Sequence, residues 1–185
     1  MTQKEFIEIL DEGKYSYEIQ GDKLVVTHRG AVFLHSLTSG VEFKNKGDVY
    51  LHALTSLPPD VVFKNGGYVS LDSLTSLPPG VVFRNGGDVW LNSLTSLPPG
   101  VEFKNKGDVV LFSLTYLPPD VVFKNKGDVD LDHLTSISPG VEFRNKGGVL
   151  LRDLIGRFGD WNGNIEGIDS KRLLNKMIKQ GVFER

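Results

Sequence analysis

Residues 81–100 read Val-Val-Phe-Arg-Asn-Gly-Gly-Asp-Val-Trp-Leu-Asn-Ser-Leu-Thr-Ser-Leu-Pro-Pro-Gly. The chain repeats this 20-residue unit with small changes and no slip in spacing, and each copy starts with a valine: Val41, Val61, Val81, Val101, Val121 and Val141. One unit of this length cannot bury its own apolar side chains, whereas stacked units can. The sequence therefore predicts an all-β repeat solenoid, in which each unit is one coil.

Each unit contains two short stretches with the alternation of β-strands. Residues 81–84 and residues 88–92 place β-branched or aromatic side chains at every second position. Asn85 and the two glycines after it tolerate positive φ, so we expect a turn between the two strands. The pattern predicts two short strands per coil and six inward apolar side chains: Val81, Phe83, Val89, Leu91, Leu94 and Leu97.

Equivalent side chains of successive coils should form columns along the solenoid, because neighbouring strands lie about 4.8 Å apart. One internal column is aromatic: Phe43, Phe63, Phe83, Phe103, Phe123 and Phe143. A second column consists of the turn asparagines from Asn45 to Asn145, whose carboxamides should bond their neighbours or the turn backbone. A degenerate coil that begins at Leu24 precedes the six copies, which gives about seven coils.

The stretches outside the repeats have a different pattern and predict a cap at each end. We expect an N-terminal helical cap in residues 1–23, the repeat solenoid in residues 24–160, and a C-terminal turn with a helical cap in residues 161–185. Caps of this kind cover open sheet edges, which otherwise recruit other chains.

Both caps show the residue spacing of short amphipathic helices. Between Lys4 and Asp11, three apolar residues share one side of the predicted helix: Phe6, Ile9 and Leu10. Near the C-terminus, Asp169 or Ser170 is the predicted N-cap of a second helix. The apolar stripe of this helix consists of Leu173, Leu174, Met177 and Ile178.

The composition limits the classes of function. A net charge of −2 fits neither a polycation for nucleic acid nor a strongly acidic mimic of it. Cysteine is absent, which removes disulfides and thiolate chemistry and fits a reducing compartment. The first residues lack the apolar stretch of a secretory signal, and every apolar run is too short to span a bilayer. We therefore expect a soluble, cytoplasmic protein without a membrane partner.

Residues 94–98, Leu-Thr-Ser-Leu-Pro, resemble the L-x-x-L-P step of short bacterial leucine-rich repeats. The whole unit is similar to phage and bacterial proteins of mostly unassigned function, and this resemblance covers residues 24–154. The leucine-rich signature L-x-L-x-x-N has two residues where Arg84 stands alone between Phe83 and Asn85. This departure favours a straighter solenoid over a curved horseshoe. The resemblance implies a role in protein recognition on the strand-bearing face.

Variation among the copies is concentrated at the outward positions of the second strand. One variable column reads Phe33, Tyr50, Ser70, Trp90, Val110, Asp130 and Leu150. The neighbouring column reads His35, His52, Asp72, Asn92, Phe112, Asp132 and Arg152. By strand alternation both columns should point outward and expose large aromatic side chains on one flat strip.

Exposed aromatic residues flanked by charge are typical of recognition hot spots. We therefore expect a non-enzymatic protein-interaction module whose partner is another protein. The alternative is that these surface positions drifted after duplication, which explains the variety but explains less well why Tyr50, Trp90 and Phe112 are kept in water. The predicted strip consists of Tyr50, His52, Trp90, Asn92, Val110, Phe112, Asp130 and Asp132.

A basic column forms a second candidate surface: Lys44, Lys64, Arg84, Lys104, Lys124 and Arg144. Stacked cations can hold phosphates, so the alternative function is nucleic-acid binding, for instance by a phage-encoded anti-defence protein that competes with nucleic acid. Acidic side chains of the same coils, such as Glu42 and Asp48, should neutralise the column, which disfavours nucleic acid as the partner. Outward Val62, Val82 and Val122 leave a homodimer through the solenoid face as a further alternative.

The sequence contains no nucleophile elbow, phosphate loop or H-E-x-x-H motif, so we expect neither an enzyme nor a bound cofactor. His35 and His52 should stack on adjacent coils, but two imidazoles lack the third ligand of a zinc site. Residues 160–164 resemble the start of a calcium loop, yet Ile165 and Lys171 stand where a glycine and an acidic ligand are required. We predict a turn there and no metal site.

Overall fold

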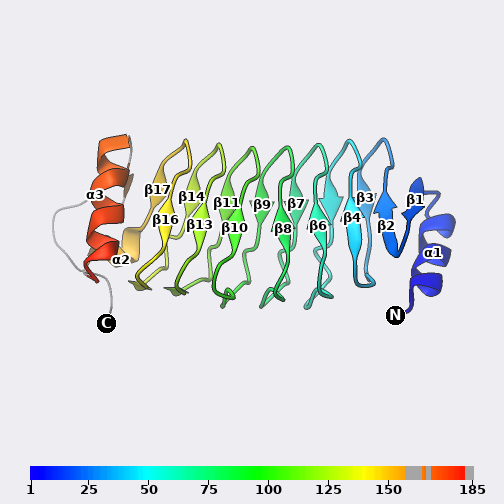
Figure 1. The fold of residues 1–185 in the computed structure, drawn as a ribbon, viewed down its shortest axis with the longest axis horizontal. Coiled ribbons are helices and arrows are strands. Elements are labelled where there is room, and N and C mark those ends of the chain that lie inside the picture. The colour runs from blue at the N-terminus through cyan, green and yellow to red at the C-terminus, as the bar shows by residue number, and fades with distance from the viewer. Residues whose placement is uncertain (157–163, 166–167, 182–185) are drawn as a thin grey trace.

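The computed structural model describes residues 1–156, 164–165 and 168–181. Figure 1 shows a straight stack of β-coils with one helix lying across each end. The two helices therefore lie at opposite ends of a rod. The predicted repeat solenoid with helical caps is confirmed.

The first strand of every coil belongs to one sheet, which we call sheet A. Its central strands pair in parallel, and an antiparallel strand, β1 (Tyr17–Gln20), forms one edge. The parallel strands are β2 (Lys23–Val26), β4 (Val41–Phe43), β6 (Val62–Phe63), β8 (Val82–Phe83), β10 (Glu102–Phe103), β13 (Val122–Phe123) and β16 (Glu142–Phe143). Strand β1 was not predicted, because it lies outside the repeats and has no counterpart in the other coils.

The second strand of every coil belongs to a second sheet, which we call sheet B. An antiparallel strand again closes one edge, here β18 (Asn164–Ile165) beside the last coil. The parallel strands are β3 (Val32–Phe33), β5 (Val49–Tyr50), β7 (Val69–Ser70), β9 (Val89–Trp90), β11 (Val109–Val110), β14 (Val129–Asp130) and β17 (Val149–Leu150). Seven strand pairs therefore make seven coils, with six steps between the first and the last.

Two pairs of neighbouring coils also have β-pairing along a third side, which the sequence did not predict. Strand β12 (Tyr116–Leu117) lies parallel to β15 (Ser136–Ile137), and Ser76 forms an isolated bridge with Ser96. The two strands place Leu117 and Ile137 in the core, which explains why this short stretch adopts extended structure.

Equivalent residues of successive coils lie side by side, as the 20-residue period requires. In sheet A, Phe103 is in register with Phe83 and with Phe123. The six phenylalanines of the internal column are at most 2% exposed, and neighbouring rings stack with centroids 5.0–5.4 Å apart. All six inward positions of the unit at residues 81–100 are buried. The predicted core is therefore confirmed.

The turn asparagines join neighbouring coils. The Nδ2 group of Asn85 donates to the backbone oxygens of Gly87 (2.9 Å) and Asp88 (3.0 Å) in its own coil. It also donates to the oxygen of Gly67 in the preceding coil, at 3.1 Å. The same set of bonds recurs from Asn45 to Asn145. The predicted bonding to the turn backbone is confirmed.

Helix α1 (Gln3–Glu12) covers the N-terminal end of the stack. The Thr2 hydroxyl accepts from the Glu5 amide and the Glu5 carboxylate accepts from the Thr2 amide, so a capping box starts the helix. Phe6 and Leu10 are fully buried against the first coils, and Ile9 is partly buried beside them. The predicted apolar side of this helix is therefore correct.

Two helices follow the last coil. The short helix α2 (Arg152–Gly156) was not predicted, and α3 (Ile168–Lys179) covers the C-terminal end of the stack. Because α3 begins at Ile168, Asp169 and Ser170 lie inside its first turn, and the predicted N-cap is wrong. The predicted turn at residues 160–164, including the boundary between residues 160 and 161, is almost entirely outside the described residues.

The buried stripe of α3 differs from the predicted one. Leu174 and Ile178 are buried, but Leu173 is 47% exposed, and Lys171 is buried in its place. Residues 171, 174 and 178 lie at spacings of three and four, which places them on one side of the helix. Within the part of the chain that the structure describes, no helix combines the length and the apolar character that a bilayer crossing needs.

Candidate functional site

The structure places the predicted strip on the sheet B side of the rod, but its two columns have different settings. Trp90 lies in strand β9, which ends at that residue. Asn92 lies in the turn that follows, closed by a hydrogen bond from the Leu94 amide to the Leu91 oxygen (3.1 Å). The second column therefore follows a row of turns. The expectation that strand alternation orients it is wrong, because the strand is only two residues long.

Four aromatic side chains form a continuous row across the first four coils: Phe33, Tyr50, Tyr68 and Trp90, here called the aromatic run. The rings of Phe33 and Tyr50 stack with centroids 4.3 Å apart and planes 6° apart. Tyr68 meets Tyr50 edge to face at 5.1 Å and stacks on Trp90 at 5.6 Å. Phe33 is 51% exposed and Trp90 is 41% exposed, so the run presents a large apolar surface to solvent.

Tyr68 is the member of the aromatic run that the sequence analysis missed. The first variable column has the small residue Ser70 at this level, and Tyr68 comes from the neighbouring column. Its ring lies between Tyr50 and Trp90 and closes the gap that Ser70 leaves, and Ser70 is only 4% exposed. The detectable signal was a tyrosine in a column that otherwise holds aspartate or glycine.

That other column has a structural role, which Tyr68 interrupts. We call it the aspartate column: Asp48, Asp88, Asp108 and Asp128. In four pairs of neighbouring coils, an aspartate Oδ1 accepts from the backbone amide of the next coil, as Asp88 does from Asp108 (2.8 Å). The equivalents are Asp48 with Tyr68, Asp108 with Asp128, and Asp128 with Gly148. Tyr68 has no carboxylate to offer the Asp88 amide, so the aromatic run is continuous at the expense of one such bond.

Polar groups beside the aromatic run are held in place by one another. The Asp72 carboxylate accepts from the Ser70 hydroxyl (2.6 Å) and from the Asn92 carboxamide (2.6 Å). Desolvation raises the pKa of Tyr68, with contributions from Tyr50 and the nearby carboxylates of Asp48 and Asp72. The Tyr68 hydroxyl therefore stays protonated at neutral pH and remains a hydrogen-bond donor.

The rest of the predicted strip is a separate cluster. Phe112 is 47% exposed and contacts the His133 ring edge to face, with centroids 4.3 Å apart. The half-buried Val110 pairs with Trp90 in sheet B and precedes Phe112 by two residues in the chain. Asp130 is also half-buried, and burial raises its pKa.

One predicted strip residue is not available to a partner. Asp132 is only 8% exposed, and its carboxylate forms an ion pair with Arg152 at 3.0 Å. The expectation that Asp132 points into solvent is therefore wrong, because the cation that follows one coil later at Arg152 covers it. His52 is exposed, and its ring lies 6.3 Å from that of His35 in an edge-to-face arrangement.

The described residues contain no cluster of three or more histidine, aspartate or glutamate side chains that could hold a metal ion. Most of the stretch that resembles a calcium loop, residues 160–164, lies outside them.

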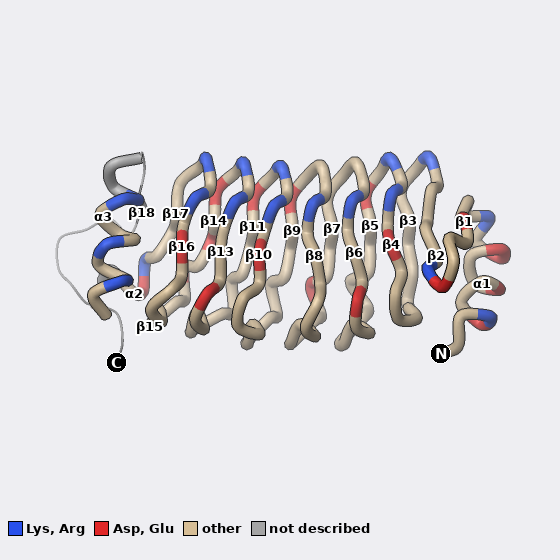
Figure 2. Tube along the Cα trace, viewed as in Figure 1, with Lys and Arg blue, Asp and Glu red and all other residues tan. Residues whose placement is uncertain are grey.

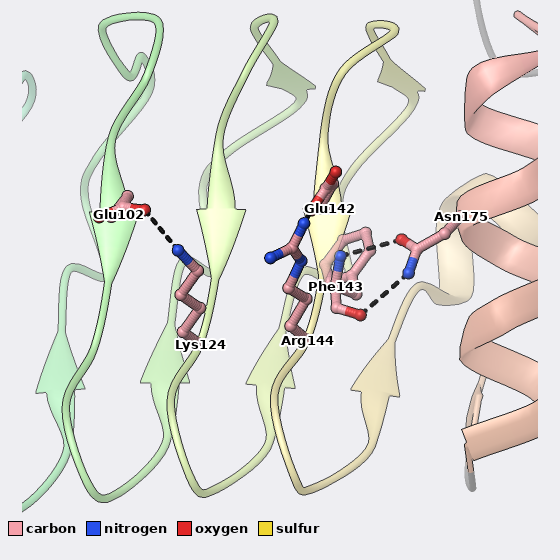
Figure 3. Close-up of polar contacts among 6 residues, drawn as sticks. All are labelled: Glu102, Lys124, Glu142, Phe143, Arg144 and Asn175. Atoms are coloured by element: carbon pink, nitrogen blue, oxygen red, sulfur yellow. Dashed lines mark hydrogen bonds and ion pairs between the residues drawn. The ribbon is translucent and has the colours of Figure 1, made fainter.

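The basic column lies on the opposite side of the rod, along sheet A, as Figure 2 shows. Each glutamate in it is placed beside cations: Glu42 pairs with Lys64 (2.9 Å) and Lys44 (3.2 Å). Glu102 pairs with Lys124 at 2.7 Å and also with Lys104, and Figure 3 shows the first of these contacts. Hydrogen bonds from both lysines lower the pKa of Glu102 to about 2.

The neutralisation of the basic column is only partial. Three glutamates face its six cations: Glu42, Glu102 and Glu142. The aspartate column was expected to supply the remaining counter-charge, but its carboxylates accept from backbone amides. Among the described residues they form no ion pair with these cations. Half-buried Val62, Val82 and Val122 lie in the same sheet, and a homodimer through them stays a prediction.

No family model, no curated protein and no solved structure matches this chain.

Proposed function

We propose that the protein is a non-enzymatic protein-interaction module that binds its partner through the aromatic run on sheet B. The observation that carries this proposal is the position of Tyr68. It makes four aromatic groups continuous in solvent, and it does so where an aspartate would have bonded the next coil. Drift after duplication gives no reason for an aromatic side chain to appear in the same coil in which the first variable column has the small residue Ser70.

The orientation of the rings favours a protein partner. Phe33 and Tyr50 are in register on adjacent parallel strands, and their planes are nearly parallel, so the rings stack along the rod axis. Tyr68 and Trp90 also stack on one another, so the facing sides of both pairs are covered by a neighbouring ring. Nucleobases bind by stacking on free aromatic faces. The exposed remainder of such packed rings suits the apolar side chains and carbonyl groups of a protein surface.

The rod also presents this surface at low entropic cost. Each ring of the aromatic run is packed against at least one other, and Asp72 and Asn92 are already hydrogen-bonded to one another. Few side-chain rotamers have to be fixed on binding, which is the main advantage of a preorganised interface. The cysteine-free sequence fits a reducing compartment, and we propose that the interaction takes place in the cytoplasm.

The test is site-specific photo-crosslinking in cells that express the protein. A benzophenone amino acid replaces Trp90 in one variant and Val82, an outward residue of sheet A, in a matched control. We expect a discrete protein adduct from position 90 that is absent from position 82 and from the position 90 variant that also carries Tyr68→Ala. Equal adducts from both positions would contradict the proposal.

A second candidate function is the binding of a nucleic-acid backbone by sheet A. The observation in its favour is the cation excess of the basic column. It continues into a groove beside α3 that is lined by Arg144, Lys146 and Arg172 and by no carboxylate. Retention on duplex DNA that falls steeply with salt would support this function. The variant Lys146→Glu with Arg172→Glu should then lose retention, and unchanged retention would contradict it.

A further inference from the structure

On the sheet B side of the rod, the strands and turns of the first six coils contain aspartates but no lysine or arginine. These strands and turns occupy residues 31–36 in the first coil and the equivalent residues of the next five. They contain seven aspartates: Asp48, Asp72, Asp88, Asp108, Asp128, Asp130 and Asp132. Three of these aspartates, Asp48, Asp72 and Asp88, belong to the coils of the aromatic run, whereas Asp132 of the sixth coil pairs with Arg152.

The bend between the two sheets lacks its usual lysine in the two coils that carry the last two rings of the aromatic run. In most coils a lysine lies two residues before the aspartate column: Lys46, Lys106, Lys126 and Lys146. The third and fourth coils have Gly66 and Gly86 at this position. These coils carry Tyr68 and Trp90. The carboxylates beside these two rings thus have the fewest cations near them within their own coils.

Two carboxylates at this level can accept from a ligand. Asp88 uses Oδ1 for the Asp108 amide, and its Oδ2 forms no hydrogen bond within the described part of the chain. Asp72 accepts one bond at each oxygen, from Ser70 and Asn92, which leaves a second lone pair on each. Both residues are half-buried, and these hydrogen bonds hold their carboxylates in place.

We infer that the aromatic run receives a basic segment of its partner protein, anchored by an arginine that pairs with Asp72 or Asp88 beside Trp90. This inference rests on the proposed function and adds the chemistry of the partner. A guanidinium group fits because it bonds a carboxylate in a bidentate manner and packs along aromatic rings, whereas an ammonium group is a compact, strongly hydrated charge. The apolar part of the segment covers the exposed ring surface from Phe33 to Tyr68.

The experiment is selection from a random 12-residue peptide library against the wild-type protein, with counter-selection against the double variant Tyr68→Ala, Trp90→Ala. Peptides enriched in arginine that bind only the wild type are the expected result. Peptides that discriminate equally well but show no excess of arginine or lysine would overturn the inference and leave the proposed function standing. A failure to obtain any discriminating peptide would count against both.

Two isosteric substitutions, Asp88→Asn and Asp72→Asn, then test the anchoring carboxylates with the selected peptides. Asp88→Asn removes a charge beside Trp90 and keeps an oxygen for the Asp108 amide. Asp108→Asn is the matched control, because Asp108 has the same role toward the Asp128 amide but follows Lys106. We expect Asp88→Asn to weaken binding about fivefold or more, and Asp108→Asn to leave it within about twofold. Equal effects, or no effect of Asp88→Asn and Asp72→Asn, would overturn the assignment.

Discussion

At the scale of single residues, Tyr68 differs from its column in contributing to the exposed aromatic surface and not to the hydrogen bonds between coils. Its neighbours in the column are aspartates that tie one coil to the next, and Tyr68 gives up that bond for contacts with Tyr50 and Trp90. This exchange of a repeated structural contact for an exposed aromatic contact is the basis of the proposed recognition role.

This view predicts different stabilities for two substitutions that both remove the ring. Tyr68→Ala should lower the free energy of unfolding by about 2 kcal/mol, because two aromatic contacts are lost. Tyr68→Asn should recover about 1 kcal/mol of this loss, because its Oδ1 can accept from the Asp88 amide. Urea unfolding followed by circular dichroism measures both. Identical midpoints for the two variants would contradict the role assigned to the column.

Glu102 on the opposite face gives a prediction about pH. Its folded-state pKa of about 2 lies below the ordinary value of 4.5, because Lys104 and Lys124 donate to it. A group with a lowered folded pKa stabilises the fold above its unfolded pKa, and the contribution is lost as the pH falls through the folded pKa. The stability difference between wild type and Glu102→Gln should therefore shrink between pH 4.5 and pH 2. The effect is small because the pair is partly exposed. A constant difference over this range would contradict the ion pairs.

At the scale of elements, the ends of the rod show how the chain limits its own length. The backbone of Phe143 in β16 has no further coil to bond. Instead its amide donates to Asn175 Oδ1 (2.9 Å) and its oxygen accepts from Asn175 Nδ2 (3.0 Å), as Figure 3 shows. One turn earlier in α3, the Lys171 ammonium donates to the oxygens of Asn145 (2.7 Å) and Gly147. Side chains of α3 thus replace the next coil.

The N-terminal end uses a similar device. The Tyr15 hydroxyl accepts from the Phe33 amide (3.1 Å) and donates to the Phe33 oxygen (3.2 Å), at the edge of sheet B. Strand β1 covers the edge of sheet A beside it. Exposed strand edges pair readily with other chains, and here side chains and antiparallel strands occupy them.

Opening the C-terminal edge should therefore cause end-to-end association. We expect Asn175→Leu to leave the Phe143 amide and oxygen unpaired, to cost about 1–3 kcal/mol of stability, and to produce concentration-dependent oligomers. Lys176→Leu is the matched control, because Lys176 is an exposed residue of the same helix. Analytical ultracentrifugation compares the two. If both variants sediment like the wild type, Asn175 does not protect the edge.

The same contacts show the limits of prediction from this sequence. Columns such as Phe43 to Phe143 were predictable because each position occurs six times with one inward pattern. The partners of Asn175, Lys171 and Tyr15 were not, because each contact occurs once and joins residues far apart in the chain. The setting of Asn92 was missed because an alternating pattern continues in sequence past the end of a two-residue strand.

At the scale of the whole molecule, the rod is a sum of nearly equivalent coils, so whole coils should be removable. In repeat proteins each unit contacts only its neighbours, and stability is roughly additive over units and their interfaces. The junctions favour removal here, because Gly80, Gly100 and Asp120 all have a positive φ of 62–83° immediately before the next coil. A deletion in register joins backbone conformations that already match.

Two deletions of equal length then separate the fold from the surface. Removal of residues 101–120 leaves the aromatic run intact, whereas removal of residues 81–100 takes away Trp90. Both proteins should fold with the circular dichroism of the parent and a slightly lower thermal midpoint, since each loses one coil and its interface. Only the protein that lacks residues 101–120 should still bind the partner and the selected peptides.

A deletion of residues 101–110 should unfold the chain, because a shift of half a coil places outward side chains in the phenylalanine column. If that shorter deletion folded normally, the register of the stack would not be what specifies this structure.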